Sequence, residues 1–571
     1  MLLVAGLIQP GSAAVAEAAT PATPSFSIVT NPPLAPAFDP SNQDYAIRCT
    51  GQYSTQITTT GSGSVVVGGR SFRGPVNLYE PLVAGQEAVV TKGGHSYFLR
   101  CLPSNFPPYG STVTGQPQAS GYLLDLQPYT VAFDSRGVPV WWYVDNGPFA
   151  PWDPKFFDST TIGWAEPAVG GCPTPGQCSG DYVLRGLDGS LKKIVGGGTV
   201  PLDFHDLQQL PNGNYLGIMD VTRNCPAVPS QCVDLSSWGL SSQAAISDNV
   251  IVEFNAANQV VWSWSVADHI DVAQANANWR DQYPDVIHMN SIEYAGNGGI
   301  IFSARHLDAV YRISMKTGAI TWKLGGTPTP QSLAVTGNQY PQLFSGQHDA
   351  RLDADGTLTV HDNGSRANRP PRALRFSIDS TTMTASIVEQ VSDSRAPSSF
   401  CCGSVQKLST GDWVMSWGAN DLMTELSPSG VPQLTITYPL RFSYREAPLK
   451  ASVKALRGGM DAMVPPLVIT GDSSPPTTTV TIPANGAVVT GGVWLDAGAT
   501  DNTGVTNVEF RLTGGGLHNS VVAEAVPTLY GWLAGWSSAT VPNGTYTLQS
   551  EAYDAAGNSA ESAGVTVTVA N

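Results

Sequence analysis

Three histidines occupy corresponding places in three repeated stretches of this chain. His205, His288 and His348 lie five, six and four residues before a motif made of a strand, a glycine-bearing turn and a returning strand. The motifs are LPNGNYLGIMD (210–220), YAGNGGIIFSARH (294–306) and LDADGTLTVHDNG (352–364). Imidazole titrates near neutral pH, so such residues can carry protons or attack an electrophilic centre. The repetition predicts that the three side chains meet in one site.

Partners for these histidines follow from hairpin geometry, because residues at equal distances from a turn face each other across an antiparallel pair. We expect His288 to face Arg305 and His348 to face His361. Asn290 lies two residues from His288 and therefore shares its face of the strand. Arginine and asparagine side chains supply hydrogen-bond donors for an anionic group held between the histidines.

The same counting places His205 opposite Asp220. A lone polar residue at a strand end is usually structural, so we interpret Asp220, His306 and His361 in that way. The corresponding position in the next repeat holds no histidine but the adjacent Cys401 and Cys402. The candidate catalytic residues are His348, His205, His288, Arg305 and Asn290.

These residues require a scaffold that repeats. Each motif is followed by a second hairpin, as in NVIVEFNAANQVVWSW (249–264) and AVYRISMKTGAITWKL (309–324), which gives four antiparallel strands per unit. That unit is the blade of a β-propeller. The first strand of each blade lines a central channel, so the residues at the starts of these strands form a ring around one mouth of the channel. We predict six blades within residues 111–450 of an all-β chain.

The flanking segments predict two smaller β domains. Residues 26–110 alternate apolar and polar residues and end in a proline-rich stretch, as expected of a β-sandwich. After a linker over 451–474, residues 475–571 read as an immunoglobulin-like sandwich of short strands. Residues 1–25 contain an apolar run and Ala-x-Ala sites, which indicate a signal peptide or a tail.

The ordered motifs resemble those of the bacterial arylsulfotransferase family. The resemblance covers about residues 26–450 and is carried by FHDLQQLPNGNYL (204–216), VIHMNSIEY (286–294), FSARH (302–306), ITWKLGG (320–326) and FSGQHDARL (344–352). The C-terminal domain resembles the Ig-like modules of secreted bacterial enzymes and lies outside the match. Cys401–Cys402 and this extra domain depart from the family pattern.

The resemblance implies a secreted, six-bladed enzyme that moves a sulfuryl group from an aryl sulfate to a phenol without a nucleotide donor. It implies that His348 is the histidine that becomes sulfurylated, with His205, His288, Asn290 and Arg305 as helpers. No cofactor and no metal are expected. The alternative is a non-catalytic propeller that binds a ligand or a partner at the same mouth. A hydrolase or lyase acting on sugars is the least favoured function, because such an enzyme needs carboxylates and the predicted ring holds only that of Asp220.

Composition narrows the partners and the compartment. A net charge of −16 argues against nucleic acid and anionic membranes as partners. The signal-like N-terminus and the eight cysteines favour export, so we expect an extracellular or periplasmic protein. No other stretch is long enough to span a membrane. The spacing of the eight cysteines favours local disulfides Cys49–Cys101, Cys172–Cys178 and Cys225–Cys232, and none has the C-x2-C spacing of a zinc site. Cys401 and Cys402 form either a vicinal disulfide or links elsewhere.

Overall fold

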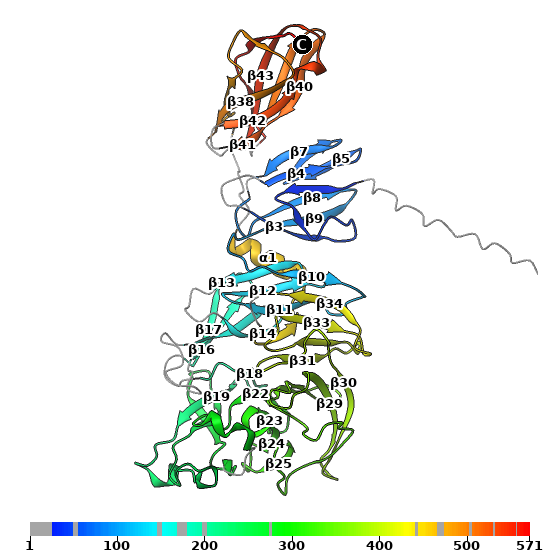
Figure 1. The fold of residues 1–571 in the computed structure, drawn as a ribbon. Helices are drawn as coiled ribbons and strands as arrows, with labels where there is room; N and C mark the ends of the chain where they lie inside the picture. The colour runs from blue at the N-terminus through cyan, green and yellow to red at the C-terminus, as the bar shows by residue number, and fades with distance from the viewer. Residues whose placement is uncertain are drawn as a thin grey trace, which may run out of the picture.

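A computed structural model describes residues 26–49, 55–80, 82–144, 151–167, 180–196, 202–272, 277–439, 443–464, 473–501, 505–528, 531–554 and 557–571. These residues form an elongated stack of three β-rich parts (Figure 1). The expected signal peptide and the expected Cys172–Cys178 pair lie outside the described residues. No helix within the described ranges is long and apolar enough to cross a bilayer.

The largest part contains, among the described residues, six sheets that each carry a four-stranded antiparallel blade. Blade one is β35 (Glu446–Pro448), β11 (Gly121–Leu126), β12 (Tyr129–Asp134) and β13 (Pro139–Val144); blade two is β14 (Trp152–Asp158), β15 (Thr161–Pro167), β16 (Gly180–Gly186) and β17 (Leu191–Val195); blade three is β18 (Leu207–Gln209), β19 (Tyr215–Thr222), β20 (Ser247–Phe254) and β21 (Val260–Ser265). Blade four is β22 (Met289–Tyr294), β23 (Gly299–Ala304), β24 (Ala309–Ser314) and β25 (Ile320–Gly325); blade five is β27 (His348–Leu352), β28 (Leu358–Asp362), β29 (Arg372–Asp379) and β30 (Thr384–Val391), with β26 (Ala334–Thr336) at its edge; blade six is β31 (Ser404–Lys407), β32 (Trp413–Ser416), β33 (Leu422–Leu426) and β34 (Pro432–Thr437), with β10 (Gly110–Val113) at its edge. This is the six-bladed propeller architecture.

The two ends of the propeller segment share blade one. The late strand β35 pairs with the early strand β11, with Leu124 opposite Glu446. The preceding residues are tied to the same strand, because the buried Asp125 carboxylate accepts hydrogen bonds from the Ser443 hydroxyl and from the Tyr444 amide, the latter at 2.9 Å. Pairing of the last strand with the first therefore closes the ring of blades.

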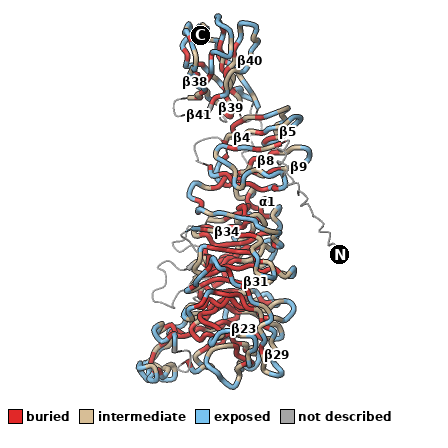
Figure 2. The backbone as a smooth tube through the Cα atoms, turned by 45° about the vertical axis from the view of Figure 1, so that its right-hand side comes forward, coloured by how far each residue is buried: buried red, intermediate tan, exposed pale blue. Residues whose placement is uncertain are grey.

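Burial follows position within each blade. The inner strands are covered on both faces, and every residue of β11, β23 and β28 is buried, whereas the outer strand β21 is mostly exposed or half-buried. Blades stack face to face, which removes both faces of a strand from water. Figure 2 shows the buried backbone concentrated in the middle of the propeller, with exposed loops around it.

The channel contains a group of ionised side chains that we call the hub: Asp153, Lys155, Asp206, Asp349, Arg351 and Arg445. The Arg445 guanidinium lies 2.6 Å from Asp153, 3.3 Å from Asp206 and 3.2 Å from Asp349. Arg351 bonds Asp206 at 2.8 Å and Asp349 at 2.7 Å, and Lys155 bonds Asp153 and Asp206, each at 2.5 Å. Although burial opposes it, Arg351 and Lys155 hold the pKa of Asp206 well below its usual value. The hub therefore pairs its buried charges.

The hub also reaches strands that contribute no charge to it. The Asp206 carboxylate accepts from the Ile292 amide of β22, and the Asp349 carboxylate accepts from the Val405 amide of β31, each at 2.9 Å. Arg445 donates to the Asn290 carbonyl at 2.9 Å. The inner strands of all six blades, or the residues next to them, are joined through this cluster.

The N-terminal part consists of two sheets. One contains β1 (Ile28–Asn31), β4 (Thr55–Thr59) and β7 (Val76–Glu80); the other contains β2 (Leu34–Ala35), β3 (Asp44–Arg48), β9 (His95–Leu102), β8 (Glu87–Lys92), β5 (Ser64–Val67) and β6 (Arg70–Arg73). The Cys49–Cys101 disulfide, expected from the sequence, joins the neighbouring β3 and β9 segments.

The C-terminal part is the expected Ig-like sandwich, with a shared core that includes Phe510, Trp532 and Tyr546. One sheet contains β36 (Thr477–Ile482), β38 (Gly492–Thr500), β42 (Gly531–Ser537) and β41 (Val526–Thr528); the other contains β37 (Ala487–Val489), β45 (Val565–Val569), β43 (Gly544–Asp554), β39 (Val505–Gly514) and β40 (Leu517–Glu524), with β44 (Ser559–Glu561) beside β43.

The segment expected to be a linker contains the helix α1 (Val453–Met463), which lies between the propeller and the N-terminal sandwich (Figure 1). Ser452 caps the helix by accepting from the Ala455 amide at 3.2 Å. Leu456 and Met460, four residues apart, are buried on one face. The two glycines at 458–459 obscure this short pattern in the sequence.

We expect an Arg445→Met variant to lower the free energy of unfolding of the propeller by about 3–5 kcal/mol, because three hub carboxylates would lose a buried cation. Thermal unfolding followed by tryptophan fluorescence would measure the change. Arg375→Met is the matched control, because Arg375 pairs with Asp355 and Glu389 near the surface. Equal transition temperatures for wild type and Arg445→Met would show that the hub contributes no net stability.

Candidate functional site

The five candidate residues lie at one end of the inner strands, but not all face open space. His205 precedes β18, His288 precedes β22, Asn290 is the second residue of β22, His348 begins β27, and Arg305 begins the 3-10 helix η5 (Arg305–Leu307). The His205 and His288 rings are 4.9 Å apart between centroids. Asn290 is fully buried, and its Nδ2 donates to the carbonyl of Gln347, next to His348, at 2.8 Å.

Two of the predicted pairings are confirmed. His348 faces His361 across β27 and β28, and the Arg305 amide donates to the His288 carbonyl at 2.9 Å. The pairing of His205 with Asp220 is wrong. The Asp203 amide bonds the Ile218 carbonyl, whereas Leu207 already pairs with Gly217, so residues 204–206 bulge out of the ladder.

His205 and His288 each have a carboxylate on Nδ1. His205 Nδ1 lies 2.6 Å from Asp203 Oδ1, and His288 Nδ1 lies 2.6 Å from Asp285 Oδ2. Burial lowers the pKa of His288 against the opposing effect of Asp285. Although burial raises it, the neighbouring His288 holds the pKa of Asp285 well below its usual value. Each carboxylate therefore fixes a proton on Nδ1 and leaves Nε2 for chemistry.

His348 has no such carboxylate. Its Nδ1 lies 2.7 Å from the amide oxygen of Asn363 and 2.9 Å from the carbonyl of Gly346. Its Nε2 accepts a hydrogen bond from the Cys402 amide at 3.1 Å. Since an amide N–H only donates, Nε2 carries the lone pair and Nδ1 carries the proton. Burial, followed by the positive charge of Arg305, lowers the pKa of His348 well below its usual value, so the ring is neutral.

Arg305 is held from two sides at the same end of the channel. It donates to His306 Nε2 at 2.7 Å and to the Phe400 carbonyl at 2.6 Å, and its guanidinium lies 4.6 Å from the Trp279 ring centre. Burial, opposed by Asp285, lowers the pKa of Arg305 to about 10, so it remains charged at neutral pH. A second guanidinium, that of Arg366, lies 4.2 Å from the same Trp279 ring.

Sequence reasoning missed Trp279, Arg366 and Asn363, and took His306 as structural. Trp279 stacks on His306 with ring centres 4.6 Å apart. Arg366 pairs with Asp281 at 2.7 Å. Trp279 and Asp281 belong to η4 (Ala277–Gln282), which lies between blades three and four and outside the repeated motif. Of the missed residues, only Asn363 lies inside a repeated motif, LDADGTLTVHDNG, so only Asn363 could have been found by comparing the repeats.

Residues 398–403, which we call the strap, lie against His348 and Arg305. Cys401 and Cys402 form a vicinal disulfide, which is one of the two alternatives expected from the sequence. The expected Cys225–Cys232 disulfide is also present. Besides the contacts to His348 and Arg305, the strap receives bonds from Asn363 Nδ2 to the Ser399 hydroxyl and to the Cys402 carbonyl, both at 2.8 Å. His348 is only 2% exposed, whereas Phe400 of the strap is 69% exposed. The strap therefore covers the buried histidine.

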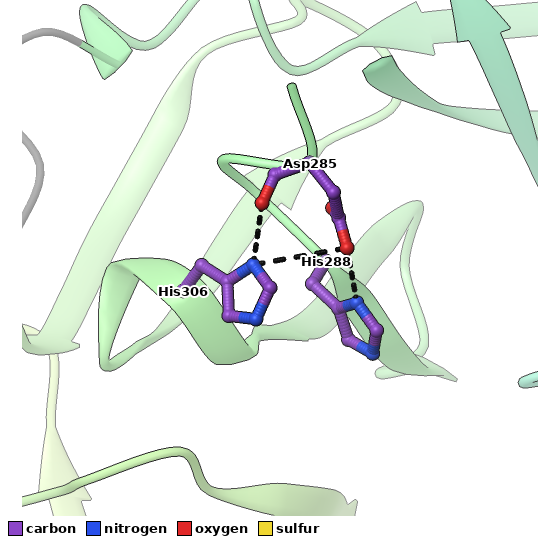
Figure 3. A group of neighbouring side chains, drawn as sticks. All are labelled: Asp285, His288 and His306. Atoms are coloured by element: carbon purple, nitrogen blue, oxygen red, sulfur yellow. Dashed lines mark hydrogen bonds and ion pairs between the residues drawn. The ribbon is translucent and has the colours of Figure 1, made fainter. Parts of the chain in front are cut away.

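Asp285, His288 and His306 have the side-chain types of a metal site (Figure 3). The hydrogen bonds point to a different use. His306 Nε2 accepts from Arg305, so His306 Nδ1 carries a proton and donates to the Asp285 carbonyl at 2.6 Å. A protonated nitrogen is no metal ligand. The three residues fit a hydrogen-bond relay that supports His288 and Arg305.

The other end of the channel opens into a cavity of about 440 Å³. Its lining includes Lys155, Glu293, Arg351, Lys407 and Lys450, and none of the candidate histidines. The hub side chains Asp206 and Arg445 also contribute to its floor. The hub separates this cavity from the histidine end.

Comparison with known proteins identifies two parts of the chain. Residues 202–438 match the family described as arylsulfotransferase (ASST), and residues 476–549 match the bacterial Ig domain. No curated protein matches the chain.

Solved structures are only distantly similar. A protein of unknown function from Bacteroides caccae has 11% identity and a TM-score of 0.37, covering 58% of this chain and 98% of its own. A putative 6-phosphogluconolactonase from Bacteroides fragilis has 12% identity and a TM-score of 0.30, covering 67% and 97%. A virginiamycin B lyase from Staphylococcus aureus has 10% identity and a TM-score of 0.29, covering 58% and 89%. None of these likenesses bears on the function.

If the strap protects His348 Nε2, a Cys401→Ser/Cys402→Ser variant should react faster with diethyl pyrocarbonate at that nitrogen. We expect an increase of about tenfold or more, measured by mass spectrometry of the peptide that contains His348. Cys225→Ser/Cys232→Ser, which removes a disulfide in another loop, should leave the rate unchanged. Equal rates in all three proteins would show that the disulfide does not hold the strap over the histidine.

Proposed function

We propose that this protein transfers a sulfuryl group from an aryl sulfate to a phenol by way of a sulfohistidine at His348, without a nucleotide donor. The match of residues 202–438 to the arylsulfotransferase family supports the proposal. The observation that carries the proposal is the neutral His348, whose unprotonated Nε2 lies within the influence of the Arg305 charge. His205 and His288 are each fixed on a carboxylate. His288 acts electrostatically on His348, and the His205 ring lies 4.9 Å from that of His288.

In the first half-reaction, His348 Nε2 attacks the sulfur of the aryl sulfate, and the bond from sulfur to the aryl oxygen breaks. The charge on the sulfuryl oxygens grows more diffuse as this bond breaks, and Arg305 supplies charged donors for those oxygens. One N–H of Asn290 is bonded to Gln347, and its second N–H is a further donor. His288 or His205 gives a proton to the departing phenolate.

In the second half-reaction, a phenol takes the place of the product. The same histidine removes the phenol's proton, and the phenol oxygen attacks sulfur, which restores neutral His348 and releases the new aryl sulfate. Splitting one transfer into two steps uses the same site twice, as expected of covalent catalysis.

The strap has to move during this cycle. Sulfur bonded to Nε2 would occupy the direction from which the Cys402 amide now donates. Arg305 likewise has one nitrogen on the Phe400 carbonyl, which a sulfuryl oxygen would replace. Outward displacement of the strap frees both groups together.

We also place the protein outside the cytosol. The described residues contain the disulfides Cys49–Cys101, Cys225–Cys232 and Cys401–Cys402 and no free cysteine. Disulfides of this kind persist in oxidising compartments.

The protein should release nitrophenol from 4-nitrophenyl sulfate in the presence of phenol and without any nucleotide. His348→Asn should lower this rate on the order of 10³-fold or more, because the nucleophile is lost. His269→Asn is the control, since His269 is exposed and stacks on Trp264 away from the site. Release that does not need phenol would indicate a hydrolase. No release by folded protein across a panel of acceptors would favour the non-catalytic binding propeller.

We expect Arg305→Lys to lower kcat about 10²-fold, because one ammonium cannot replace a guanidinium that spreads its donors over several sulfuryl oxygens. Steady-state kinetics would separate kcat from KM. Arg312→Lys, on the strand β24, is the control, because Arg312 is half-exposed and bonds Thr321 in the outer part of its blade. An unchanged kcat for Arg305→Lys would show that the Arg305 guanidinium does not stabilise the transition state.

A further inference from the structure

The three histidines at the site differ in the atom that accepts the proton of Nδ1. Asp203 and Asp285 place a carboxylate oxygen 2.6 Å from Nδ1 of His205 and His288. At His348 the corresponding side chain is the amide of Asn363, at 2.7 Å. A carboxylate stabilises an imidazolium far more than a neutral amide oxygen does.

The hydrogen bonds of Asn363 fix which way its amide points. Its Nδ2 donates to the Cys402 carbonyl, which only accepts, and to the Ser399 hydroxyl, which in turn donates to the Cys401 carbonyl. A flipped amide would set Oδ1 against the Cys402 carbonyl. Oδ1 therefore faces His348 and accepts the proton of Nδ1.

Among the residues that the structure describes, the hydrogen-bond partners of the His348 ring are Asn363, the Gly346 carbonyl and the Cys402 amide, and none is an anion. The titratable and charged groups with the largest effect on it are Arg305 from η5, His361 from β28 and His288 before β22. The other acceptor on Nδ1 is the neutral Gly346 carbonyl. The charged arginine disfavours a second proton on this ring. The amide of Asn363 favours that proton, but far less than a carboxylate in its place would.

From this contrast we propose that Asn363 is a positioning residue that holds the Nδ1 proton of His348, and so leaves the lone pair on Nε2, without adding the negative charge that would stabilise an imidazolium. The exchange of carboxylate for amide then separates the nucleophile from the two histidines that carry protons. The inference rests on the proposed function and deepens it. His205 and His288 gain and lose a proton on Nε2 with a carboxylate behind them, while His348 forms and breaks its bond to sulfur without being protonated.

The test is Asn363→Asp, which puts a carboxylate on Nδ1 of His348. Stabilising the imidazolium raises the pH at which His348 loses its second proton, so the acidic limb of the kcat/KM profile should move upward by one pH unit or more. At a pH below that limb the variant should be at least tenfold less active than wild type, and activity should return as the pH rises. The ¹⁵N resonances of labelled histidine would show His348 doubly protonated over the same pH range.

Two control variants separate charge from damage. Asn363→Leu removes the amide without adding charge and should not move the acidic limb upward. Asn420→Asp adds a charge and removes one bond to the Ser398 carbonyl of the strap and one to the Trp417 carbonyl, neither of which involves His348. It should leave the protonation of His348 unchanged.

The reciprocal variant, Asp285→Asn, tests the other half of the proposal and does not depend on Asn363→Asp folding. It should lower the basicity of His288. The rate should then fall more with phenyl sulfate than with 4-nitrophenyl sulfate, because the poorer leaving group needs the proton more.

The proposal is overturned if His348 shows the same protonation in wild type and Asn363→Asp. It is also overturned if Asn363→Asp and Asn363→Leu lose activity equally at every pH, or if Asp285→Asn affects both substrates alike. Wild-type protein without sulfuryl transfer would contradict the proposed function. The ¹⁵N titration would still decide whether His348 is less basic with the amide of Asn363 on Nδ1 than with a carboxylate there.

Discussion

The arrangement of this site depends on the buried ion pairs of the hub. Six blades meet in the channel, and each inner strand would otherwise be free to slide along its neighbours. Arg351 and Arg445 bind carboxylates from blades two, three and five, and those carboxylates bind amides of blades four and six. Because a buried charge without its partner is costly, this network admits few registers of the strands. The network of ion pairs therefore also fixes the positions of the histidines at the starts of these strands.

The hub also explains two of the sequence motifs. In the H-D and Q-H-D motifs, the histidines His205 and His348 belong to the site, whereas the aspartates Asp206 and Asp349 belong to the hub. Asp349 adopts a left-handed φ of 53°, which turns the chain between the two layers. In each motif the histidine therefore serves the site and the next residue, the aspartate, serves the hub. The two are adjacent in sequence because the chain enters the channel between them.

Much of the fold and part of the site could be predicted from the sequence. The repeated hairpins predict the blades, and counting from the turns places His348 opposite His361 and Arg305 beside His288. Counting failed for His205 because a bulge leaves no trace in hydrophobic alternation. Trp279 and Arg366 lie on connecting segments that follow no repeat. The hub was hidden because a charged residue inside a channel looks, in sequence, like one on a surface.

The closure of blade one has a consequence for the order of events during folding. Strand β11, which begins at residue 121, pairs with β35, which ends at residue 448. More than three hundred residues must therefore be synthesised after β11 begins before the ring can close. Until then β11 presents an unpaired edge, to which any other strand can add. A chain of this topology would benefit from staying unfolded until its last propeller strand is available. A chain interrupted before that strand would expose an edge prone to aggregation.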